Sequence, residues 1–167
     1  MFSSLLLLAC GGPEITFTPS ELEEYRPIYH FSPAKGWMND PNGLIYYKGK
    51  YHLFFQHNPH ENVWGHMSWG HAVSEDLMHW NELPVAIACD DSHAIFSGSA
   101  VIDYFNTTGF GTLENPAMVA IYTAHKHDGS HQSQALAYSL DEGLTWVKYQ
   151  GNTHRFKATS SDFWTMV

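Results

Sequence analysis

Residues 37–43, Trp-Met-Asn-Asp-Pro-Asn-Gly, place a candidate catalytic carboxylate in a restrained stretch of backbone. Pro41 lacks a backbone donor and shifts Asp40 from helical toward extended geometry. Asn42 and Gly43 are residues that tolerate positive φ, so the sequence predicts a tight turn directly after Asp40. A carboxylate held in one direction can act as a nucleophile or as a base, and Asp40 is the first candidate for such chemistry.

Two aromatic and aliphatic runs follow, residues 44–47 and 51–56, and Lys48-Gly49-Lys50 separates them. This pattern predicts a β-hairpin that begins just after the carboxylate. Further polar and aromatic motifs come next, at residues 56–59 (Gln-His-Asn-Pro), 64–72 (Trp-Gly-His-Met-Ser-Trp-Gly-His-Ala) and 96–100 (Phe-Ser-Gly-Ser-Ala). In this order and spacing, residues 29–150 resemble glycoside hydrolase family 32, the β-fructosidases that include invertases, inulinases and levanases.

The resemblance implies a fructose pocket around a nucleophilic Asp40. Amide and hydroxyl groups in this pocket would bind ring hydroxyls, and aromatic side chains would form its apolar walls. The matching substrate-binding positions are Trp37, Asn39, Gln56, Trp64, Phe96 and Ser97. We interpret Trp69 and His71, which lie in the same motifs, as packing residues. The resemblance implies neither a cofactor nor a metal.

A repeat predicts the architecture. Residues 71–80 and 136–146 each end a strand with Ser-x-Asp and resume at a Trp, and Ser74 and Ser139 lie 65 residues apart. The second copy resembles the Asp-box turn of sugar-processing β-propellers, so we assign Asp76 and Asp141 to scaffolding. Short runs rich in β-branched and aromatic residues complete the pattern, at residues 96–102, 118–123, 134–139 and 146–149. The period and the strands predict an all-β β-propeller. The resemblance to glycoside hydrolase family 32 implies a five-bladed β-propeller, of which this chain would hold about the first two to two and a half blades.

Composition excludes some function classes. The chain has 167 residues and a formal charge of −9, with 8 Lys and Arg against 17 Asp and Glu. No basic stripe exists that could neutralise phosphates, so a nucleic-acid partner is disfavoured and a neutral fructoside fits better. The twelve histidines include the pairs His66/His71 and His125/His127, but their spacings match no familiar zinc signature. We therefore predict no metal site.

The N-terminus predicts export. Residues 1–9 form a short apolar signal segment, and Leu7-Leu8-Ala9-Cys10 resembles a bacterial lipobox in which Cys10 would be lipidated. We expect residues 10–28 to be a linker, residues 29–167 to form the partial propeller domain with divergence after about residue 152, and the protein to lie at the bacterial cell envelope. Cys89, the other cysteine, is interpreted as a small buried side chain.

The resemblance breaks after residue 152. Family members carry an Arg-Asp-Pro motif and then a Glu-Cys motif whose Glu is the general acid/base, and neither motif occurs in this chain. Retaining hydrolysis needs two carboxyl groups about 5 to 5.5 Å apart. The predicted function is retaining double-displacement hydrolysis of β-D-fructofuranosides (sucrose, or fructans such as inulin and levan) by a chain present as a truncated fragment. The alternative is an inactive truncated product or a non-catalytic sugar-binding remnant.

Overall fold

The computed structural model describes residues 26–27 and 29–151. The expected signal segment 1–9, Cys10, most of the expected linker 10–28 and the divergent residues 152–167 lie outside this part. Over the described residues the chain forms strands, turns and loops, with no helix long and apolar enough to cross a membrane.

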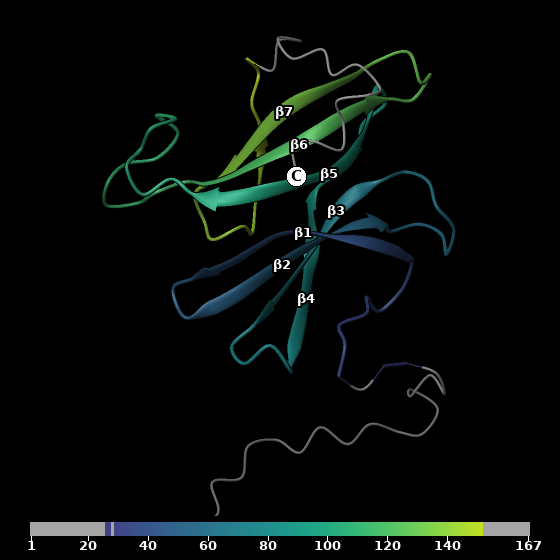
Figure 1. The fold of residues 1–167 in the computed structure, drawn as a ribbon, viewed down its shortest axis with the longest axis horizontal. Helices are drawn as coiled ribbons and strands as arrows, with labels where there is room; N and C mark the ends of the chain where they lie inside the picture. The colour runs from purple at the N-terminus through teal and green to yellow at the C-terminus, as the bar shows by residue number, and fades with distance from the viewer. Residues whose placement is uncertain (1–25, 28, 152–167) are drawn as a thin grey trace, which may run out of the picture.

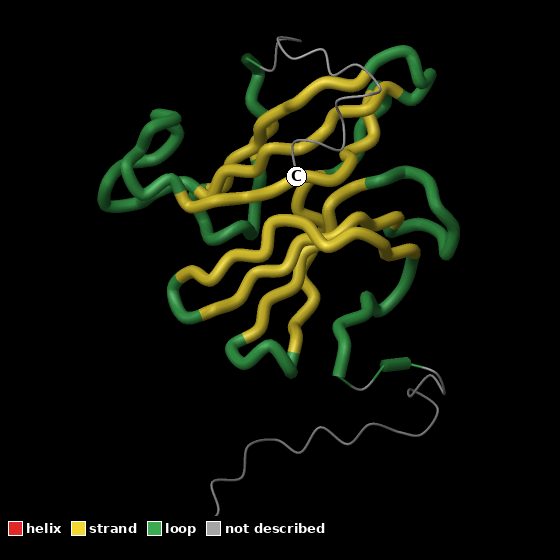
Figure 2. The backbone as a smooth tube through the Cα atoms, in the orientation of Figure 1, coloured by secondary structure: helices red, strands yellow, loops and turns green. Residues whose placement is uncertain are grey.

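The strands form two four-stranded antiparallel sheets, each a simple meander in chain order (Figures 1 and 2). The first sheet holds β1 (Trp37–Tyr47), β2 (Lys50–Asn58), β3 (Ser68–Ser74) and β4 (Trp80–Ile87). The second holds β5 (His93–Ile102), β6 (Met118–Lys126), β7 (Gln132–Ser139) and β8 (Val147–Lys148). We call these sheets blade 1 and blade 2. The strands predicted at 96–102, 118–123, 134–139 and 146–149 are confirmed as β5 to β8, with small shifts in their bounds.

Strand β1 differs from the prediction. The heptapeptide does not precede the strand as a turn; it forms the first part of β1, and the register with β2 shifts between Met38 and Pro41 and again between Asn42 and Ile45. Asn42 has no positive φ, whereas Gly43 does, at 46°. The prediction of a tight turn at Asn42 and Gly43 is therefore wrong. Pro41 is compatible with the strand because β1 lies at the edge of its sheet and its missing N–H removes no central ladder bond.

The reversal between β1 and β2 comes five residues later than Gly43. Lys48 (φ 47°) and Gly49 (φ 84°) occupy left-handed conformations there, as the two central residues of a tight hairpin require. The hairpin predicted over 44–56 is thus confirmed, with Lys48-Gly49 as its turn.

Both Ser-x-Asp turns have the predicted structural role. In blade 2, the Asp141 carboxylate accepts hydrogen bonds from the backbone N–H and the hydroxyl of Thr145 and from Ser139, and the Trp146 indole N–H donates to the Gly143 carbonyl. Blade 1 repeats the pattern, with Asp76 accepting from the backbone of Met78 and His79. The carboxylates of Asp76 and Asp141 therefore stabilise these turns.

The core lies between the two sheets. Phe54 and Trp69 from blade 1 are fully buried, and they meet Trp146 and Tyr122 from blade 2 at ring-centroid distances of 5.4 and 6.4 Å. Gly43 allows β1 to approach β5, because a Cβ there would lie 2.8 Å from the Ala100 Cβ. The inner strands β1 and β5 are consequently side by side, as Figure 1 shows.

Candidate active site

Asp40 and Ser97 meet across the two blades. The Ser97 hydroxyl donates a 2.7 Å hydrogen bond to Oδ2 of Asp40, although 57 residues separate them. Asp40 is exposed, and Ser97 is half-buried. Among the described residues, Ser97 is the side chain that donates to the Asp40 carboxylate, and it does so at Oδ2. Two motifs predicted to share a pocket therefore lie together, one from β1 and one from β5.

Irregular pairing on both inner strands creates this meeting point. Asp40 lies in the register shift of β1, and Ser97 lies in a shift of β5 between Ile95 and Gly98. A bulge redirects a side chain that regular alternation would send elsewhere. Gly98 is required at this point because a Cβ would lie only 2.0 Å from the carbonyl oxygen of Ile121.

Two further side chains link the blades beside Asp40. Asn42 is buried, and its Oδ1 accepts a 3.2 Å hydrogen bond from the Gly98 N–H. Gln56 is also buried, and its Nε2 donates to the Ile95 carbonyl at 3.0 Å. The Gln56 amide nitrogen thus connects blade 1 to blade 2. The predicted sugar-binding role of Gln56 therefore concerns its side-chain oxygen. The link from Asn42 was missed by the sequence reasoning, which treated this residue as part of a turn.

Trp37 and Asn39 fix each other next to Asp40. The Trp37 indole N–H donates to Oδ1 of Asn39 at 2.9 Å, and both side chains are half-buried. The Trp37 carbonyl pairs with Nδ1 of His57 at 2.9 Å, which anchors the start of β1 to β2. The Asn39 oxygen is therefore occupied by a hydrogen bond within the site.

Trp64 and Phe96 form an aromatic corner. Trp64 lies in the loop between β2 and β3 with 60% of its surface exposed, and its ring lies edge-on to Phe96 with centroids 6.1 Å apart. Buried Asn58 shapes this loop, since its Nδ2 donates to the Val63 carbonyl at 2.9 Å. Trp69 is fully buried and donates its indole N–H to the Phe96 carbonyl at 3.0 Å, so its predicted packing role is confirmed.

His125 is a neighbour of the site that the sequence reasoning did not select. Its imidazole stacks on the Phe96 ring with centroids 4.4 Å apart and planes 11° apart. Gln132 Nε2 lies 2.9 Å from its Nδ1. Stacking partners that come from different strands leave no spacing signal in a sequence, so no sequence motif could have found this contact.

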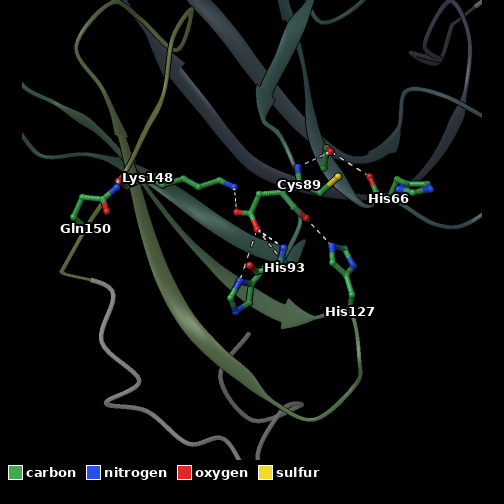
Figure 3. A network of polar contacts seen from close by, with 9 residues as sticks. His66, Cys89, His93, His127, Lys148 and Gln150 are labelled. Atoms are coloured by element: carbon green, nitrogen blue, oxygen red, sulfur yellow. Dashed lines mark hydrogen bonds and ion pairs between the residues drawn. The ribbon is translucent and has the colours of Figure 1, made fainter.

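The connector between the blades is fixed by a polar network around Asp90 (Figure 3). The Asp90 carboxylate accepts a 2.7 Å hydrogen bond from Lys148 and backbone hydrogen bonds from Ser92 and His93. Burial alone would raise the pKa of Asp90, but these donors and the Lys148 charge outweigh it and lower the pKa to about 2. The His127 ring contacts the Asp90 carbonyl at 2.7 Å. The start of β5, which leads to Phe96 and Ser97, is thereby tied to β6 and β8.

Comparison with known proteins decides the family. Residues 30–163 match the description "Glycosyl hydrolases family 32 N-terminal domain". The chain belongs to glycoside hydrolase family 32. Levanase of Bacillus subtilis (strain 168) is 51% identical over 152 residues, which cover 91% of this chain and 22% of that protein. An extracellular exo-inulinase of Aspergillus awamori is 50% identical over 151 residues, covering 81% of this chain and 28% of its own length.

Solved structures of this family share the fold. A crystal structure of exo-inulinase from Aspergillus awamori superposes with a TM-score of 0.72 at 51% identity, covering 77% of this chain and 28% of that chain. Fructofuranosidase from Schwanniomyces occidentalis, solved in complex with fructose, gives a TM-score of 0.72 at 49% identity and covers 77% of this chain and 26% of that one. The family 32 chain spans about a quarter of the length of these proteins, and the expected all-β propeller-type fold is confirmed.

The histidines of this family 32 chain do not form a metal centre in residues 26–27 and 29–151, where no three His, Cys, Asp or Glu side chains gather suitably. His71 is fully buried and pairs with His52 at 3.1 Å, so its predicted packing role is confirmed. Burial, with the neighbouring His52 as a second cause, lowers the pKa of His71 to about 3. Cys89 is half-buried and unpaired, rather than fully buried as predicted.

Proposed function

We propose that this chain supplies the nucleophile and the fructose-binding pocket of a retaining β-D-fructofuranosidase. The observation that carries the proposal is the 2.7 Å hydrogen bond from Ser97 to Asp40, which joins two distant motifs at one exposed carboxylate. The names of the relatives, a levanase and an exo-inulinase, support fructans as the substrate class, and a related fructofuranosidase was solved with fructose.

The proposed first step is attack by Asp40. Oδ1 forms a bond to the anomeric carbon of the fructosyl unit while the bond to the leaving oxygen breaks, which gives a covalent fructosyl-enzyme. Ser97 holds Oδ2 and thereby fixes the direction of the attacking oxygen. Water then hydrolyses the ester, so the anomeric configuration is retained.

The surrounding residues would orient the sugar. Asn39 offers its amide N–H groups, Gln56 offers its side-chain oxygen, and the aromatic side chains exclude water and present apolar faces. Trp64, with its exposed ring, is available to contact a ligand directly. We assign the aromatic walls to Trp37, Trp64 and Phe96.

Retaining hydrolysis needs a second carboxyl group that protonates the leaving oxygen. In the family this group is the Glu of a Glu-Cys motif, and the printed sequence contains no such pair. We propose that turnover requires this acid from a segment equivalent to the remaining part of the relatives. The chain alone would then bind fructosides without releasing fructose at an enzymatic rate.

A chimera tests the proposal. The 152-residue match in the Bacillus subtilis levanase would be replaced by the corresponding segment of this chain, and fructose release from levan, inulin and sucrose would be measured. We expect release by the chimera and a loss of at least about 1,000-fold in Asp40→Asn, because the amide is a poor nucleophile. Asp91→Asn, at an exposed carboxylate two residues before β5, is the matched control and should retain full activity.

The results separate the two functions. Full activity of the Asp40→Asn chimera would contradict the assignment of the nucleophile. Fructose binding by the 167-residue chain, measured by titration calorimetry, together with an inactive chimera would favour a non-catalytic sugar-binding protein.

We also propose that the protein is exported and anchored by lipid at Cys10. The extracellular exo-inulinase among the relatives is consistent with export. Expression in a bacterium fed radiolabelled palmitate should label the chain, and Cys10→Ala should abolish the label, while Cys89→Ala should keep it. A labelled Cys10→Ala variant would refute the anchor.

A further inference from the structure

The His125 ring stacks on the ring of Phe96, at the edge of the proposed sugar pocket. We infer that His125, held by Gln132, is a positioning residue that fixes the Phe96 wall of the sugar pocket. The inference rests on the proposed function, since Phe96 is a pocket wall only if this site binds a fructosyl unit. His125 acts through Phe96 and is given no contact with the reacting atoms.

The stack between the two rings is close and nearly parallel. Centroids lie 4.4 Å apart with an interplanar angle of 11°, which is tighter than the 6.1 Å edge-on contact of Phe96 with Trp64. Phe96 comes from β5 and His125 from the adjacent strand β6, where His125 lies opposite Ala94. The bulge that follows Ile95 removes Phe96 from regular pairing, so its ring orientation depends on side-chain contacts.

A hydrogen bond fixes the imidazole ring in turn. Gln132 lies opposite His125 in the β6–β7 register, and its Nε2 is 2.9 Å from Nδ1 of His125. Because the amide nitrogen donates, Nδ1 accepts, which is the neutral form of the ring. Burial and the neighbouring His127 lower the pKa of His125, which also favours this form. A neutral ring anchored at Nδ1 presents one fixed face to Phe96.

Fixing the Phe96 ring matters for sugar binding. A wall that is already ordered before binding loses no rotamer freedom when the sugar arrives, so the affinity is higher than for a mobile ring. The hydrogen bond from Trp69 fixes the backbone of Phe96 through its carbonyl. The orientation of the Phe96 ring depends instead on its contacts with His125 and Trp64. His125 therefore supplies the restraint that the backbone contacts do not.

The test compares three variants of the 167-residue chain by titration calorimetry with fructose. His125→Phe keeps a flat ring on Phe96, whereas His125→Leu keeps apolar bulk and removes the ring. We expect His125→Leu to raise the Kd for fructose about two- to tenfold, the range that an aromatic stack supports, and His125→Phe to stay within twofold of the unaltered chain. Lys126→Ala, the next residue of β6, is the matched control and should leave the Kd unchanged.

Thermal unfolding of each variant separates positioning from general stability. A Kd change in His125→Leu with an unaltered Tm supports the inference, and so does rescue by His125→Phe. Equal Kd values for His125→Leu and the unaltered chain overturn the inference alone, as does an equal loss in both His125 variants. Absence of fructose binding by the unaltered chain overturns the proposed function and this inference together.

Discussion

Three serine–aspartate hydrogen bonds of similar length occupy two different settings in this molecule. In the Asp-box turns, Ser74 bonds Asp76 at 3.1 Å and Ser139 bonds Asp141 at 2.7 Å, each pair two residues apart. Between the blades, Ser97 bonds Asp40 at 2.7 Å across 57 residues of chain. The same pair of residue types thus links the two sheets at one place and closes a local turn at two others.

The settings differ in how many donors surround each carboxylate. Asp141 accepts from Ser139 and twice from Thr145, and these hydrogen bonds outweigh the effect of burial, so its pKa is lowered. Asp40 is exposed, and among the described residues its carboxylate accepts a single side-chain hydrogen bond, from Ser97 to Oδ2. A saturated carboxylate stabilises structure, whereas a partly satisfied, oriented one is available for chemistry.

A side chain at Gly98 should disturb the contact between Ser97 and Asp40 more than any other change considered, because it blocks the close approach of β5 and β6. In Gly98→Ala the new Cβ would meet the Ile121 carbonyl oxygen at 2.0 Å and the Tyr122 Cα at 2.7 Å, both of which are backbone atoms that cannot swing away. We expect a loss of about 3 kcal/mol in the free energy of unfolding, measured with urea. Gly109→Ala, where an added methyl meets nothing within 4 Å, should cost only about 1 kcal/mol of backbone strain. Equal losses in both variants would contradict this account.

Removing the Ser97 hydroxyl should alter rate rather than stability. In the levanase chimera we expect Ser97→Ala to lower kcat about 10- to 100-fold, because Asp40 loses its orienting donor. The Tm should change by less than about 2 °C, since the Ser97 side chain is only half-buried. Ser99→Ala, two residues along β5 and exposed, serves as the control. An unchanged kcat in Ser97→Ala would show that the hydrogen bond has no catalytic role.

Removing the Ser139 hydroxyl should have the opposite effect. The hydroxyl is buried and accepts from the Gly143 N–H at 2.9 Å, so Ser139→Ala leaves that donor without its partner. We expect a loss of about 2 kcal/mol in unfolding free energy and an unaltered kcat per folded molecule. If kcat falls while stability holds, the distinction between the two settings fails.

The buried histidines and the carboxylates should change the stability of the fold in different pH ranges. Because the pKa of His71 is lowered to about 3, the unfolded chain binds a proton more readily than the folded one below about pH 6.5. Stability is therefore full above pH 6.5 and falls as the pH drops toward 3. We expect a loss of about 1.5 kcal/mol between pH 6.5 and pH 5 from His71, with His52 changing in the same direction.

Urea unfolding at several pH values measures this loss. Asp141 contributes in a lower window, because its stabilisation is lost only as the pH falls below about 4. His71→Phe should reduce the slope of the curve between pH 6.5 and 5, where the contribution of His52 remains, and it should leave the part below pH 4 unchanged. A curve that is already flat in the unaltered chain would show that the histidines bind protons equally in the folded and unfolded states, which would contradict the lowered pKa of His71.

Local chemistry made part of this molecule predictable. The Asp-box turns follow from Ser, Asp and Trp at fixed offsets, and their hydrogen bonds close within a few residues. The match of two motifs to a family predicts Asp40 and Ser97 as site residues. Their actual contact depends on two bulges and on the approach of β1 to β5, which no local pattern encodes. For the same reason the stack of His125 on Phe96 and the link from Asn42 to Gly98 were missed.

The irregularity of β1 also affects how this sheet meets other chains. An edge strand exposes unpaired N–H and C=O groups that can pair with a second molecule and begin aggregation. Pro41 removes one of these donors, and the two register shifts break the even row that an incoming strand would need. The irregular backbone that presents Asp40 therefore also disfavours intermolecular β-pairing. A variant with a regular β1 would lose both this protection against aggregation and the orientation of the Asp40 side chain.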